Sequence, residues 1–208
     1  MSAQTLTIAA PNIKTAVFGI RGTAPLVVNR FSLKAREMIR ATQAEGSTAR
    51  GKKKREAKDF RALFEGSMYR SKDGWVGVHA GSFRNAMISA CRTVGVPMTR
   101  AKLAVFIEAD GFDAADGTPL VRVHGDPMQH EAMTRNATGV CDLRVRAMFE
   151  EWRAELRVRF DADMLSLSDV ANLLARVGLQ VGIGEGRPDS KASGGVGWGT
   201  FELQGEPA

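Results

Sequence analysis

Two segments in the second half of the chain alternate strictly between apolar and polar residues. In "CDLRVRAMF" (141–149), Cys141, Leu143 and Val145 alternate with polar side chains, and "WRAELRVRF" (152–160) has the same period. A period of two places alternate side chains on opposite faces of a strand, so each segment is predicted as a strand with one solvent-facing side. Because a short acidic stretch joins them, we expect a hairpin whose wet face carries five arginines.

Two other segments carry apolar residues at the spacing of a helix. Residues 83–94 place theirs on one continuous face, with Ser82 positioned to cap the helix and Gly95 to end it. Residues 166–178 repeat the pattern, with Gly178 expected to close the helix. A less regular helix is expected over residues 31–45.

Shorter apolar runs predict further strands at 13–20, 74–80 and 199–205, and on either side of an Asp- and Gly-rich turn between residues 103 and 125. The order of strands, helices and hairpins indicates an α+β fold. We expect one domain over residues 1–208, of ferredoxin-like or RRM-like type, with helices on one face of an antiparallel sheet. An extra hairpin and a basic insertion would be added to it.

Positive charge is concentrated in one part of the chain. The net charge is +6, with 44% hydrophobic and 25% charged residues. Residues 30–61 hold eleven basic and four acidic residues, whereas the rest holds 18 basic and 19 acidic. We therefore expect an insertion at about 46–61 that contacts a polyanion, with a solvated, mobile segment as the alternative.

The glycine-rich loop at 182–199 is the second biased segment, with seven glycines. It follows a helix and precedes a strand, the reverse of a nucleotide-binding glycine loop, so a P-loop and a dinucleotide site are excluded. The histidines and acidic residues match no standard ligand spacing, and we expect neither metal nor cofactor. No signal peptide or run of 18 apolar residues is present, so we expect a cytoplasmic protein with reduced, mostly buried thiols at Cys91 and Cys141.

The end of the chain resembles the glycine-rich loop of the RAMP superfamily, the ferredoxin-like RNA-binding proteins of CRISPR effector complexes. Gly182-x-Gly184, a polar stretch and Gly197-x-Gly199 before a short strand carry this resemblance. The chain also resembles proteins encoded by phages and prophages. That resemblance rests on Pro25-Leu26, Arg30-Phe31, the basic residues 52–61, "SACR" at 89–92, "DLR" at 142–144 and residues 182–188.

The first resemblance implies a non-enzymatic subunit that holds single-stranded nucleic acid, RNA in preference to DNA, by its phosphates. Such subunits assemble into filaments or ribonucleoproteins, and insertions reach the neighbouring protomer. The basic, flexible and aromatic residues expected to contact the strand are Arg30, Lys52, Lys53, Lys54, Arg55, Arg84, Arg144, Arg157, Arg159, Gly184, Gly186, Arg187, Lys191, Gly197 and Trp198.

Two other functions remain open from the sequence. A phage structural or assembly protein would self-associate without nucleic acid. A processing ribonuclease would use His79 for acid–base chemistry. Core packing is an equal alternative for Trp198, and a plain solvated face is an equal alternative for the arginine-bearing strands.

Overall fold

The structure is a computed structural model that describes residues 8–30, 58–135, 139, 141–190 and 195–205. It is an α+β fold with antiparallel sheets. The predicted helix at 31–45 and most of the basic insertion lie outside the described residues. Within the described part of the chain, no helix is long and apolar enough to cross a membrane.

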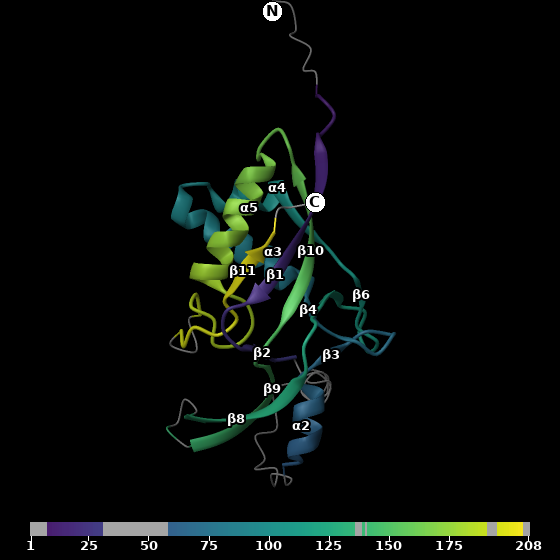
Figure 1. Ribbon diagram of the computed structural model, residues 1–208, viewed down its shortest axis with the longest axis vertical. Helices are drawn as coiled ribbons and strands as arrows, with labels where there is room; N and C mark the ends of the chain where they lie inside the picture. Colours follow the sequence, from purple (N-terminus) through teal and green to yellow (C-terminus); the bar gives the residue numbers. More distant parts are fainter. Residues whose placement is uncertain (1–7, 31–57, 136–138, 140, 191–194, 206–208) are drawn as a thin grey trace, which may run out of the picture.

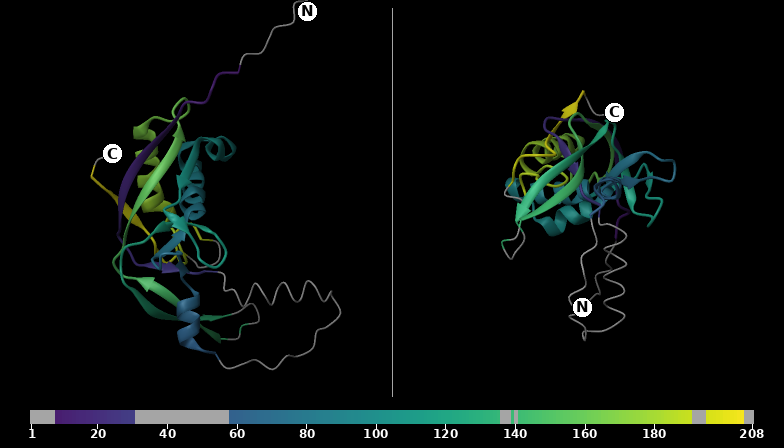
Figure 2. Two further views of the ribbon diagram at one scale, coloured as in Figure 1. Left: turned by 90° about the vertical axis from the view of Figure 1, so that its right-hand side faces the viewer. Right: turned by 90° about the horizontal axis from the view of Figure 1, so that it is seen from below.

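The centre of the molecule is a four-stranded antiparallel sheet with the order β11-β1-β10-β5 (Figure 1). Its strands are β1 (Ile13–Gly22), β5 (Val105–Glu108), β10 (Arg153–Asp161) and β11 (Phe201–Gln204). Helices α3 (Ala80–Ala90) and α5 (Leu167–Arg176) cover one face, as the left view of Figure 2 shows. Along the chain these elements follow in the order strand, helix, strand, strand, helix, strand.

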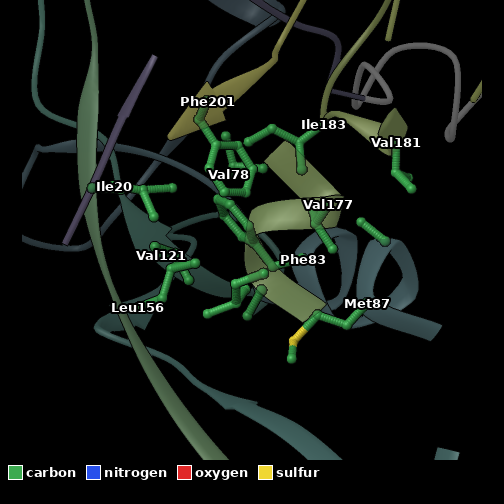
Figure 3. Close-up of a cluster of buried hydrophobic side chains, with 14 of the residues drawn as sticks. Ile20, Val78, Phe83, Met87, Val121, Leu156, Val177, Val181, Ile183 and Phe201 are labelled. Carbon is green, nitrogen blue, oxygen red and sulfur yellow. The ribbon is translucent and has the colours of Figure 1, made fainter. Parts of the chain in front are cut away.

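The core lies between this sheet and its helices (Figure 3). Ile20 and Leu156 point inward from β1 and β10, and both are completely buried. Phe83 from α3 meets Phe201 from β11 edge to face, with ring centroids 6.3 Å apart. In β10 the apolar residues of the alternating pattern point into the core. The arginines between them therefore lie on the opposite side, which faces solvent.

A second sheet has the order β2-β9-β8 and extends from the lower end of the molecule in Figure 1. Its strands are β2 (Leu26–Val28), β8 (Pro127–Arg135) and β9 (Cys141–Phe149), and α2 (Phe60–Gly66) packs against β9. A third sheet joins β3 (Tyr69–Arg70), β4 (Val76–His79), β7 (Pro119–Arg122) and β6 (Gly111–Phe112) in that order.

Three short helical segments complete the described chain. The 3-10 turn η1 (Cys91–Val94) continues α3, and α4 (Met98–Ala104) leads into β5. The π-helical turn η2 (Val177–Val181) continues α5 and ends at Gly182, whose φ is +66°. Of the three, η2 sets the direction in which the chain enters the glycine-rich loop.

The expected hairpin between residues 141–149 and 152–160 is wrong. Both segments are strands, but β9 pairs with β8 and β2, whereas β10 pairs with β1 and β5. Between them Trp152 is buried, and its Nε1 donates a hydrogen bond of 2.9 Å to the Ala24 carbonyl. Alternation predicts a strand and its buried face, but partners are chosen by non-local packing.

Several helix boundaries and one thiol also differ from expectation. Ser82 does not cap α3, because the helix begins earlier, at Ala80, after His79. Gly95 does end η1, with φ of +72°. Gly178 lies inside η2 and does not close the helix, because the chain continues as a π-turn to Gly182. Cys91 is buried as expected, whereas Cys141 is exposed at the start of β9.

Candidate nucleic-acid interface

A cavity of about 620 Å³ lies where the central fold meets the second sheet. One wall is α3, a second is the first part of the glycine-rich loop (182–190), and a third combines the end of β2 with Arg144 of β9. Its volume is in the range of pockets that bind small ligands or single nucleotides. Segments that are far apart in the sequence therefore converge on one cavity.

The α3 wall is a polar stripe. His79, Ser82, Asn85 and Ser89 all line the cavity, and their spacing places them on one side of the helix. The opposite side carries the apolar residues of the core. No side chain caps the N-terminus of α3, so amide groups of its first turn have no helical acceptor. The apolar pattern predicted this helix, but the polar stripe on its other side was missed.

The glycine-rich loop is held against β2 by backbone hydrogen bonds. The amide of Glu185 donates to the Val27 carbonyl at 2.9 Å, and the amide of Gly199 donates to the Pro25 carbonyl at 2.7 Å. A Cβ atom at Gly184 would lie 2.5 Å from the Val27 carbonyl oxygen. The lack of a side chain at Gly184 therefore allows the backbone of β2 in the same protein to approach the loop closely.

Gly186 and Gly197 have different surroundings. A Cβ atom at Gly186 would meet the Trp198 ring at 2.5 Å, whereas Gly197 has open space around it. Trp198 is half-buried and meets His130 of β8 edge to face, with ring centroids 5.2 Å apart. Its ring therefore packs within the protein between the loop and the second sheet.

The carboxylates that line the cavity are already paired. Glu185 accepts from Nε of Arg146 at 2.9 Å. Asp189 accepts hydrogen bonds from the Ser89 hydroxyl and from Arg92. The hydrogen bond from Ser89, and then Arg92 and Arg187, hold the pKa of Asp189 below its ordinary value against the opposing effect of burial.

Two arginines line the cavity beside these pairs. Arg144 on β9 is exposed and makes no hydrogen bond or ion pair with any residue that the structure describes. Arg187 donates to the Gly184 carbonyl at 3.1 Å. Together with Arg92 and Arg146, which pair with Asp189 and Glu185, these arginines outnumber the carboxylates at the cavity.

The predicted arginines Arg84, Arg157 and Arg159 lie elsewhere, near β5 and β10. Arg157 forms an ion pair with Asp110, and Arg159 lies 4.0 Å from Glu108. Arg84 donates to the carbonyls of Lys102 and Val105, and it shares the Phe106 ring with Arg159. Arg157 and Arg159 lie on the face of the central sheet that the helices leave open, whereas Arg84 reaches from α3 to β5, and none of the three lines the cavity.

The remaining predicted contacts are buried or outside the description. Arg30 bonds to Asp113 at 2.7 Å, and only 10% of its side chain is exposed. Lys52, Lys53, Lys54, Arg55 and Lys191 lie outside the described residues. The structure thus brings together Arg144, Arg187, Gly184 and Gly186 of the predicted set.

The sequence matches no known protein-family model, and no curated protein matches it significantly. Among the described residues, no group of three or more potential metal ligands occurs.

Proposed function

We propose that this protein binds single-stranded nucleic acid, RNA in preference to DNA, through its phosphate backbone, and that it assembles into a filament or multi-subunit complex. The observation that carries the proposal is the cavity, which is lined by Arg144, an arginine with no partner among the described residues, and by the polar stripe of α3, whose N-terminus has no side-chain cap. Arg144 and the first turn of α3 would bind phosphate oxygens. Such contacts hold a strand with little dependence on its sequence.

The topology of the central sheet supports the proposed family. The element order strand, helix, strand, strand, helix, strand and the sheet order β11-β1-β10-β5 support the proposed ferredoxin-like fold, which the resemblance to the RAMP superfamily implies. Strands β8 and β9 of the second sheet are inserted between β5 and β10, the second and third strands of that plan, and β2 follows β1. In this proposal the second sheet places Arg144 beside a nucleic-acid strand that lies against α3.

Fluorescence anisotropy with a labelled single-stranded RNA, titrated at several salt concentrations, tests the proposal. Affinity should fall as salt rises, with a slope of about 0.7 per phosphate contacted. Arg144→Ala should lower the slope by about one contact and weaken binding about tenfold. Arg100→Ala is the matched control, because Arg100 is exposed on α4, away from the cavity lining. Absent or salt-independent binding by the parent protein would refute the proposal.

A ribonuclease is the second candidate, because His79 lines the same cavity at the start of α3. An imidazole beside a bound strand is placed for acid–base chemistry on RNA. The same RNA, recovered from the titration and run on a denaturing gel, separates the two functions. Intact RNA supports binding alone, whereas cleavage that disappears in His79→Ala supports the nuclease.

A further inference from the structure

β8 is a long edge strand. Within the described part of the chain it pairs with β9 on one side and with no strand on the other. It spans nine residues, whereas the outer strands of the other two sheets span two to four. An unpaired strand edge presents backbone donors and acceptors that another strand can satisfy.

The hydrogen bonds of β9 show which residues of β8 face outward. The amide of Ala147 donates to the Ser67 hydroxyl at 2.8 Å, and the carbonyl of Leu143 accepts from Lys58 at 2.9 Å. Backbone groups at these positions therefore point away from β8, and their register partners, Gln129 and Met133, do not exchange hydrogen bonds with β9. By the same alternation, Gln129, Glu131 and Met133 direct their amides and carbonyls to the outer edge.

Apolar side chains flank this edge. The exposed fraction of Met133 is 82% and that of Met128 is 45%, and they belong to opposite faces of the strand. Pro127 has no amide proton. Because it lies two residues before Gln129, its backbone faces the outer edge, and no hydrogen bond between β8 and β9 is lost there. A strand added to this edge would cover the two methionines.

At the opposite end of the molecule, residues 8–11 precede β1 and pair with no described helix or strand. They have no helix or strand conformation and are exposed, with Ile8 84% exposed. They extend beyond the central sheet at the end of the long axis opposite to β8 (Figures 1 and 2). In the sequence, "TLTIAA" (5–10) alternates Leu6, Ile8 and Ala10 with two threonines and an alanine, a pattern typical of a strand.

We propose that the N-terminal segment up to Ala10 of one copy adds to the β8 edge of a second copy as an extra strand. Because the segment and β8 lie at opposite ends, the contact joins different surfaces and repeats head to tail, which builds open chains of subunits. This inference rests on the self-association part of the proposed function. It does not depend on nucleic acid.

Sedimentation velocity of the full chain without nucleic acid tests the contact. Glu131→Pro removes an outward amide without breaking a hydrogen bond to β9, whereas the control Glu131→Ala keeps the amide. The parent protein and Glu131→Ala should form species larger than a monomer that grow with concentration. Glu131→Pro should weaken self-association about tenfold or more. A monomeric parent, or equal assembly of the two variants, would overturn the proposal.

A peptide of residues 2–12 provides a second measurement on the full chain. Added in excess, it should occupy the β8 edge and dissociate the assemblies, whereas a peptide of the same composition in scrambled order should not. Assemblies unchanged by the first peptide would contradict strand addition. RNA binding by Glu131→Pro is measured separately, so a failure of nucleic-acid binding and a failure of this contact give different results.

Discussion

The cavity and the open face of the central sheet both carry arginines, but their arginines differ in what surrounds them. On the sheet, Arg157 and Arg159 lie beside Asp110 and Glu108. In the cavity, the carboxylates are paired with other residues, and Arg144 has no partner among the described residues. The count of arginines on a surface therefore says less about anion binding than the pairing of each one.

The geometry of the two regions explains this difference. Pairing between neighbouring strands brings side chains of one face close together, so Glu108 on β5 lies diagonally across from Arg159 on β10. The cavity instead collects side chains from a helix, a loop and a strand of another sheet. No register relates them, and Arg144 has no partner there among the residues that the structure describes.

The largest expected effect concerns the loop that forms one wall of the cavity. Gly184→Ala should lower the free energy of unfolding by about 3 kcal/mol, because the added Cβ strains a left-handed backbone and meets the Val27 carbonyl. Gly197→Ala has the same backbone strain with open space around it and should cost about 1 kcal/mol. Urea unfolding measures both. Equal costs would show that the loop is not held against β2.

A smaller effect is expected from the contact between Asp189 and α3. Asp189→Asn should lower the free energy of unfolding by about 1 kcal/mol at neutral pH, since an ionised acceptor is lost to Ser89 and Arg92. The folded protein lowers the pKa of Asp189, so the stabilisation is present above the ordinary value of 3.8 and is lost as pH falls through the lowered pKa. Urea unfolding at neutral and acidic pH should show the two proteins converging in acid. A difference that does not change with pH would contradict this origin.

The smallest effect is expected on the open sheet. Arg159→Ala should change the affinity for single-stranded RNA by less than about twofold, because the arginine already lies near Glu108 and Phe106. Arg144→Ala, measured in the same anisotropy assay, provides the contrast. If Arg159→Ala weakens binding as much as Arg144→Ala, the open sheet would replace the cavity as the interface.

The sequence predicted the elements more reliably than their partners. Both predicted segments form strands, β9 and β10, and the apolar positions of residues 152–160 are buried as expected, but Cys141 is exposed and the hairpin between the segments is wrong. Their partners lie far away in the sequence, and a period of two carries no information about them. The candidate site shows the same limit, because the basic residues were identified while Asp110, Asp113 and Glu108 were not recognised as partners of Arg157, Arg30 and Arg159.

By itself, the sequence determined that residues 141–149 and 153–160 are strands and that residues 83–90 and 167–176 are helices, because a period of two or of 3.6 dictates which face each segment buries. It did not reveal strand β8 or helix α4. Only the tertiary structure decided which arginines are paired. It also decided that one side of α3 packs in the core while the other side lines the cavity. Those outcomes depend on distances between residues that are remote in the chain, and local periodicity does not record them.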